Sequence, residues 1–146
     1  NHLHLRLTLQ ATKTGKHVLW KKPLAITAGE AEQLRRCPRD RIVMEAFMVR
    51  FHPQWLRARE IVKSGEIGEL KTVNVVFSYF NADPTNVGNM ADIGGGGILD
   101  IGCYPVVGAR FLFGSEPKRV VSVIERDPSS RAIERAMPTR PAFEAA

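Results

Sequence analysis

Helical and strand-like hydrophobic patterns alternate in the first third of the chain. The predicted elements are helices over 3–14 and 27–36 and strands over 17–20 and 41–47. Asn1 is a plausible N-cap of the first helix, with Gly15 just beyond its end, and Thr27 and Glu30 form the Ser/Thr-x-x-Glu pattern that opens a helix. The order helix, strand, helix, strand predicts parallel strands joined by crossover helices, which is an α/β layer structure.

The pattern changes near Met48, where we place a boundary between two architectures. The elements predicted beyond it are a helix from Pro53 to Ser64, a strand over 70–80, a loop over 81–93, a helix up to Phe113 capped by Gly114, and a strand over 117–126. In the 70–80 strand, apolar side chains at 73, 75, 77 and 79 alternate with polar ones at 72, 74 and 78. Such alternation is typical of an open sheet with one wet face, so we expect an α+β region there that also holds residues 120–124.

These changes predict three segments along the chain. They are a partial α/β domain over 1–48, a partial α+β domain over 49–127 and a poorly ordered tail over 128–146. The tail is rich in Ser, Arg, Ala and Pro and has little apolar face, although a short frayed helix is an alternative interpretation.

Composition places the chain among globular proteins, since 44% of its 146 residues are hydrophobic and 25% are charged. No apolar run approaches the roughly 20 residues of a membrane-spanning helix, so we expect no membrane contact.

Cys37 and Cys103 lack a metal-binding or redox spacing, and His2 and His4 lack a third ligand nearby, so no metal site is expected. Two thiols favour a reducing compartment, which makes the cytoplasm the default location. The chain starts at Asn1 without Met, and we expect it to be an internal piece.

A net charge of +6 raises the question of nucleic-acid binding. The basic residues that gather in one place surround Pro38, and they are Arg35, Arg36, Arg39 and Arg41. This stretch is typical of a helix end and its solvated loop, and no aromatic residues are interleaved with the charges. A solvated loop is therefore favoured over a nucleic-acid patch.

Two clusters are candidates for chemistry. Lys21, Lys22 and Pro23 directly follow a predicted strand, and ligands of parallel α/β sheets bind beyond the carboxyl ends of strands. Asp100 and Tyr104 are four residues apart, which places both on one face of a helix. The alternatives are that the lysines are simply solvated, that Asp100 is a cap and that Tyr104 is a core residue. Because Pro105 would clash with the carbonyl one turn earlier, a kink or a helix start near Tyr104 is expected.

Together these segments resemble the Gfo/Idh/MocA oxidoreductases, and the match covers most of the chain before residue 128. The matching segments are Asn1-His2-Leu3-His4, Gly15-Lys16-His17-Val18-Leu19, Lys22-Pro23-Leu24-Ala25, residues 44–53, Gly65-Glu66-Ile67-Gly68 and residues 95–105. At position 104 the tyrosine resembles the branch of the family that contains xylose dehydrogenases and dimeric dihydrodiol dehydrogenases. The resemblance implies the C-terminal part of a Rossmann-type parallel sheet followed by the start of an α+β open-sheet domain. It makes residues 1–48 a partial dinucleotide-binding domain and residues 49–127 a partial catalytic and substrate domain.

The resemblance also implies roles for individual residues. Lys22, Asp100 and Tyr104 match the catalytic positions around the reacting carbon. The cofactor, NAD or NADP, would be contacted by Asn1, His4, Lys21, Lys22, Pro23 and Arg50. The implied reaction moves a hydride between a sugar-type carbon and nicotinamide, and the full-length protein would pair with copies of itself through the open sheet. A cis Lys22–Pro23 bond, a tendency of the family, is an alternative to the more common trans form.

Two departures from the family pattern bear on activity. The glycine-rich Gly-x-Gly-x-x-Gly turn that holds the pyrophosphate is absent from the sequence, and Lys21 stands where the family usually has Glu. We therefore expect a fragment of an NAD(P)-dependent dehydrogenase that does not turn over sugars by itself. The alternative, favoured by Lys21, is a non-catalytic relative that binds a sugar or a protein partner through its sheet.

Overall fold

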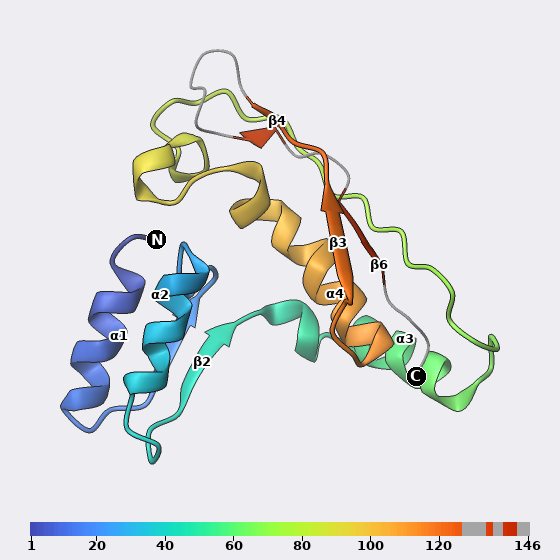
Figure 1. Ribbon diagram of the computed structural model, residues 1–146, viewed down its shortest axis with the longest axis horizontal. Helices are drawn as coiled ribbons and strands as arrows, with labels where there is room; N and C mark the ends of the chain where they lie inside the picture. The colour runs from blue at the N-terminus through green and yellow to red at the C-terminus, as the bar shows by residue number, and fades with distance from the viewer. Residues whose placement is uncertain (127–133, 136–138, 143–146) are drawn as a thin grey trace.

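The structure is a computed structural model that describes residues 1–126, 134–135 and 139–142 (Figure 1). Its helices are α1 (His4–Lys13), α2 (Ala28–Gln33), α3 (Pro53–Ser64) and α4 (Cys103–Phe113). Its short turns are the 3₁₀ turns η1 (Leu34–Arg36), η2 (Met48–Phe51), η3 (Val87–Asn89) and η4 (Ala91–Ile93) and the π-helical turn η5 (Ile98–Gly102). Its strands are β1 (Val18–Lys21), β2 (Val43–Ala46), β3 (Arg119–Ser122), β4 (Glu125–Arg126), β5 (Glu134–Arg135) and β6 (Thr139–Ala142).

The first 46 residues form a small α/β unit around the parallel pair β1–β2. The strands pair in register from Val18 opposite Val43 to Lys21 opposite Ala46, which confirms the predicted parallel arrangement and the α/β fold class. Figure 1 shows α1 and α2 side by side over the pair. Thr8 and Thr12 of α1 are fully buried, and the Thr12 hydroxyl donates to the Thr8 carbonyl at 3.0 Å.

The two helix starts of this unit differ from their predicted capping. Asn1 does not cap α1, whose N-cap is Leu3 without a side-chain hydrogen bond. The Asn1 amide instead donates to the Gly94 carbonyl at 2.8 Å, because the fold brings that distant acceptor within reach. At α2 the Thr27 hydroxyl accepts from the Glu30 amide as predicted, but the Glu30 carboxylate accepts from Ile26 rather than from Thr27.

Helices α3 and α4 pack against each other in the second part of the chain (Figure 1). Pro53 is the first residue of α3, and Gly65 ends it with a left-handed φ of 77°, as predicted. Trp55 meets Phe111 edge to face with ring centroids 6.5 Å apart, and the Arg59 guanidinium lies 4.3 Å from the Phe111 centroid. Aromatic and cation–π contacts of this kind add to the apolar burial between the helices.

The predicted strand over 70–80 is wrong. This stretch is extended but pairs with no described strand, and Val76 and Phe80 are 91% and 93% exposed. A period-two pattern indicates which side chains share a face, but a strand also needs a neighbour that pairs with its backbone groups. The second predicted strand occurs as β3 and β4; β3 pairs antiparallel with β6 rather than with 70–80.

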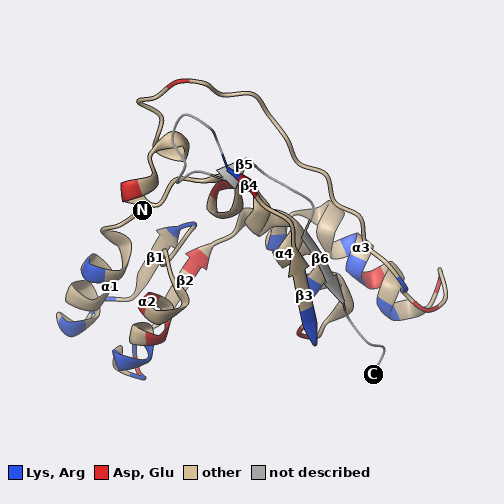
Figure 2. Cartoon of the chain, turned by 45° about the horizontal axis from the view of Figure 1, so that its top comes forward, with Lys and Arg blue, Asp and Glu red and all other residues tan. Residues whose placement is uncertain are grey.

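Most of the predicted tail lies outside the described residues. Its described residues, 134–135 and 139–142, form β5 and β6. The poor order expected for the tail stays a prediction. The three-segment division itself stays a prediction. Among the described residues no helix combines the length and the apolar character required to cross a membrane. Figure 2 shows Lys and Arg distributed over several separate elements, with Asp and Glu interspersed.

The glycine run before α4 generates the first testable prediction. A Cβ on Gly95 would lie 2.6 Å from the Val87 carbonyl oxygen and 2.7 Å from that of Met90. Gly95→Ala should therefore force the backbone apart and lower the free energy of unfolding by about 1–3 kcal/mol, measured by urea denaturation. Gly29→Ala is the matched control, since its nearest non-neighbouring atom is 3.9 Å away, and it should be neutral or stabilise by up to about 1 kcal/mol. Equal effects at the two positions would contradict the steric argument.

Candidate active site

The turn after β1 is held from two sides. The Lys22–Pro23 peptide bond is cis, and the Pro23 carbonyl lies 2.6 Å from Nδ1 of His4. The His4 ring stacks on Trp20 with centroids 4.7 Å apart. From β2, a carboxylate oxygen of Glu45 accepts the Leu24 amide at 2.8 Å. Helix α1 and strand β2 therefore fix the direction in which Lys22 leaves the end of the sheet.

A distorted helix start presents the partner of this lysine. Residues 98–102 form a π-helical turn that leads directly into α4, so the helix does not follow a regular α course before Pro105. This matches the predicted start near Tyr104, because a wider turn accommodates the proline ring. Pro105 also has no N–H to donate to the carbonyl of Asp100, five residues earlier. The Lys22 ammonium donates to that carbonyl instead.

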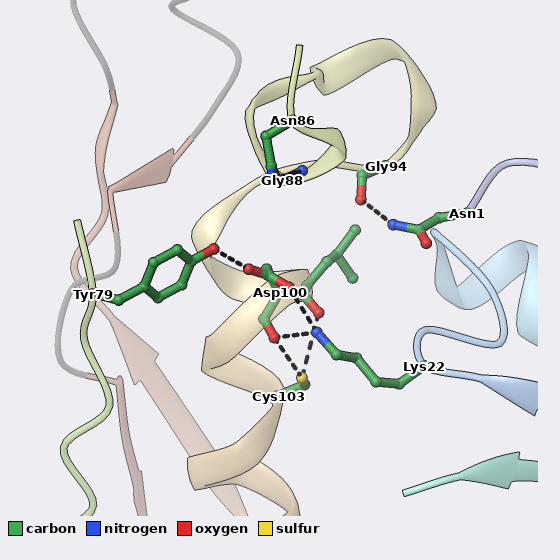
Figure 3. A network of polar contacts seen from close by, with 9 residues as sticks. Asn1, Lys22, Tyr79, Asn86, Gly88, Gly94, Asp100 and Cys103 are labelled. Atoms are coloured by element: carbon green, nitrogen blue, oxygen red, sulfur yellow. Dashed lines mark hydrogen bonds and ion pairs between the residues drawn. The ribbon is translucent and has the colours of Figure 1, made fainter. Parts of the chain in front are cut away.

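Lys22 and Asp100 form the central ion pair (Figure 3). Nζ lies 2.8 Å from Oδ1 of Asp100, and the side chains are 12% and 36% exposed. Burial alone raises the pKa of Asp100, but hydrogen bonds from Lys22 and Tyr79 and the charges of Lys22 and Lys21 outweigh it, so the pKa lies below its ordinary value. Asp100 is therefore a carboxylate at neutral pH.

Tyr104 packs beside this pair with its ring enclosed by other aromatic rings. Its centroid is 4.9 Å from that of Phe47 and 5.2 Å from that of Phe77. The Lys22 ammonium lies 5.5 Å from the Tyr104 centroid. The structure thus brings together the three predicted catalytic residues. Within the described part of the chain, the Tyr104 hydroxyl has no hydrogen-bond partner, which leaves it available to a ligand.

Tyr79 is a site residue that the sequence analysis missed. Its hydroxyl donates to Oδ2 of Asp100 (Figure 3). This hydrogen bond, together with burial and the Asp100 charge, raises the pKa of Tyr79 above its ordinary value. In the sequence, Tyr79 falls on the same alternating face as Phe77. That shared face and the tyrosine hydroxyl were the only features that could have indicated Tyr79 as a site residue.

Cys103 also lies near Lys22, but its thiol is not activated as a nucleophile. Burial raises the pKa of the Cys103 thiol, with the Lys22 charge partly offsetting it, and the thiol donates to the Leu99 carbonyl at 3.3 Å. A neutral, hydrogen-bonded thiol is a poor nucleophile.

The residues predicted to contact a cofactor fall into two places. The first place is the set of contacts just described, which holds Asn1, His4, Lys22 and Pro23, with the exposed Lys21 next to them at the end of β1.

Arg50 instead lines a groove of about 580 Å³ between β2, α3 and α4. Arg59, Arg110 and Phe111 line the same groove, whereas Lys22, Asp100 and Tyr104 do not. The structure does not bring Arg50 to the Lys22–Asp100 pair.

The ion pair generates the second testable prediction. A double-mutant cycle with Lys22→Met and Asp100→Asn should give a coupling of about 1 kcal/mol, at the upper end for a partly exposed pair, because Lys22 is largely enclosed. The exposed pair Arg57–Glu60, with side chains 58% and 66% exposed, is the control and should couple by about 0.5 kcal/mol or less.

The coupling should also depend on pH. Because the pKa of Asp100 is lowered in the folded protein, the stabilisation is complete above the unfolded-state pKa of about 3.9 and is lost as the pH falls through the lower folded pKa. Couplings that are equal at both pairs, or that do not change in acid, would show that Lys22 and Asp100 interact no more strongly than surface charges.

Comparisons with known proteins identify related sequences. Residues 55–138 match the model of the GFO/IDH/MocA C-terminal domain. An uncharacterized oxidoreductase of Rhizobium meliloti is 47% identical over 131 residues, which cover 88% of this chain and 39% of that protein. A D-xylose 1-dehydrogenase (NADP(+)) of Haloferax volcanii is 40% identical over 82% of this chain and 37% of its own length.

A solved structure gives the same result in three dimensions. The aldose–aldose oxidoreductase of Caulobacter crescentus, complexed with glycerol, superposes with a TM-score of 0.76 at 30% identity and covers 92% of this chain and 42% of that one. This chain therefore spans well under half the length of these relatives. The matched domain, the relatives and the shared fold confirm the resemblance expected from the motifs, and the chain belongs to the Gfo/Idh/MocA oxidoreductase family.

Proposed function

We propose that this chain carries the proton-transfer site of an NAD(P)-dependent oxidoreductase acting on a sugar-type substrate. The observation that carries the proposal is the position of the Lys22 ammonium, 2.8 Å from the Asp100 carboxylate and 5.5 Å from the Tyr104 ring centroid. The relatives that act on xylose and on aldoses support a polyhydroxylated substrate. These relatives are more than twice as long as this chain, which supports the expectation that this chain alone is inactive.

The residues at the end of β1 fit the nicotinamide end of the cofactor, which would accept or supply the hydride when bound. Ligands of parallel sheets bind beyond the carboxyl ends of the strands, where the Lys22–Pro23 turn lies. His4 fixes this turn through the Pro23 carbonyl. The chain has no glycine-rich turn of the kind that holds a pyrophosphate, so its contacts would serve only one end of a dinucleotide.

The proton chemistry follows from the two groups that border Lys22. In the reductive direction the Tyr104 hydroxyl donates its proton to the substrate carbonyl oxygen while the carbon gains a hydride, and oxidation reverses both transfers. The Lys22 ammonium stabilises the negative charge that develops on that oxygen. Asp100 holds Lys22 in place through the ion pair, and its side chain is 36% exposed, so its carboxylate can accept a hydrogen bond from a substrate hydroxyl.

A homo-oligomer and a cytoplasmic location stay predictions. Apolar side chains exposed on and after β3 provide a surface for the former: Val120, Val121, Val123 and Ile124 are 57%, 55%, 60% and 46% exposed. The non-catalytic alternative is favoured by Lys21, which is exposed at the end of β1 and adds a second positive charge near Asp100. It predicts binding of a sugar without turnover.

The third prediction tests catalysis. The chain alone should form negligible NAD(P)H from xylose or glucose, because a cofactor held at one end cannot keep the nicotinamide at the reacting carbon. Joining a family N-terminal half with its Gly-x-Gly-x-x-Gly turn ahead of Asn1 should restore turnover. In that fusion, Tyr104→Phe and Lys22→Ala should each lower kcat/KM by about 10²–10⁴-fold, since the first removes the proton donor and the second removes the charge that stabilises the developing oxyanion.

Lys16→Ala is the control for Lys22→Ala, since Lys16 is exposed beyond the end of α1. It should leave kcat/KM unchanged. If the fusion turns over sugar and Tyr104→Phe retains full activity, another group moves the proton. If the fusion binds sugar and cofactor but shows no turnover even with Lys21→Glu, the non-catalytic alternative holds.

A further inference from the structure

The extended segment before η3 contacts both residues of the helical pair Asp100 and Tyr104. Phe77 packs edge to face on Tyr104, and two residues later Tyr79 donates to Asp100. In an extended backbone, residues two apart point to the same side, and in a helix residues four apart share a face. Phe77 and Tyr79 therefore lie on one side of the extended segment, and Asp100 and Tyr104 lie on the helix face opposite it. When Phe77 packs on Tyr104, Tyr79 is placed next to Asp100.

The two oxygens of Asp100 have separate partners. Oδ1 accepts from the Lys22 ammonium and Oδ2 accepts from the Tyr79 hydroxyl (Figure 3). Holding both oxygens fixes the rotation of the carboxylate, which a single contact with Lys22 leaves free. Each carboxylate oxygen can accept about two hydrogen bonds, so Oδ2 retains capacity for a substrate hydroxyl.

Gly88 provides the space in which this second contact forms. A Cβ at position 88 would lie 3.5 Å from both the Tyr79 hydroxyl and Oδ2 of Asp100, and 3.1 Å from Oδ1 of Asn86. The Asn86 side chain in turn accepts the Gly88 amide at 2.9 Å, which fixes the turn beside the tyrosine. Because Gly88 has no side chain, the space beside it stays open and the Tyr79 hydroxyl can reach Asp100.

We infer that Tyr79 is a positioning residue that holds the Asp100 carboxylate for a substrate hydroxyl, while Tyr104 is the tyrosine left free to exchange a proton. The two tyrosines of the chain then have different tasks. This inference rests on the proposed function for its meaning, since the held carboxylate would orient a hydroxyl neighbouring the reacting carbon. The raised pKa of Tyr79 agrees with it, because at neutral pH Tyr79 is a neutral donor and Asp100 is an ionised acceptor.

The test compares the same substitution at the two tyrosines in the full chain of 146 residues. The titration of the Asp100 side-chain carboxyl carbon is followed by ¹³C NMR in the parent, Tyr79→Phe and Tyr104→Phe proteins. Tyr79→Phe should move the pKa of Asp100 upward, because the charged form loses a hydrogen bond, whereas Tyr104→Phe should not move it. An Asp100 titration that Tyr79→Phe leaves unchanged, or that both substitutions shift equally, would overturn the inference.

A second measurement observes Tyr79 directly. In Tyr104→Phe the only remaining phenol is Tyr79, so phenolate absorbance reports its titration alone. Adding Asp100→Asn should lower the pKa of that phenol, because the carboxylate that disfavours the phenolate is gone. Identical titrations with and without Asp100→Asn would contradict a contact between the two residues. Neither measurement needs cofactor or turnover, so a lack of turnover in the fusion with the N-terminal half would leave both results intact and would count against the proposed function alone.

Discussion

Lys22 places an ammonium group in a position where only 12% of its side chain is exposed, and the arrangement around it depends on a partner for that charge. A charge removed from water is tolerated when it is paired and hydrogen-bonded. Asp100, 78 residues later, supplies both a carboxylate and a backbone carbonyl to it. This contact joins the α/β unit to the helical region, and the Asn1 amide reinforces the junction by donating to Gly94.

The helical distortion and the glycine run both serve that contact. The π-helical turn presents Asp100 just ahead of Pro105, and the proline cannot donate to the carbonyl that Lys22 uses. The preceding glycines let the backbone approach closely, since a Cβ on Gly95 would meet carbonyl oxygens at 2.6 and 2.7 Å. The features that make the start of α4 irregular therefore also allow the contact between Lys22 and Asp100. Beside this contact, the rings of Phe47 and Phe77 pack on Tyr104.

The elements that depend on local signals were predicted well. The parallel pair β1–β2, the proline start of α3 and the glycine ends of α3 and α4 follow from apolar runs and from the backbone preferences of Pro and Gly. The motifs also indicated Lys22, Asp100 and Tyr104, and the structure brings these residues together. The strand over 70–80 failed because its alternation describes one face of an extended segment and not its pairing.

The sequence by itself determined the family, the small parallel sheet and the three residues proposed for catalysis, because each is encoded in a contiguous motif or a short periodicity. Only the tertiary structure decided which groups meet across long separations in the chain. It placed Tyr79 on Asp100, turned Asn1 from a helix cap into a link to Gly94, and paired β3 with β6. The physical reason is that hydrogen bonds and ion pairs between distant residues depend on distance and direction in space, which no local pattern of side chains records.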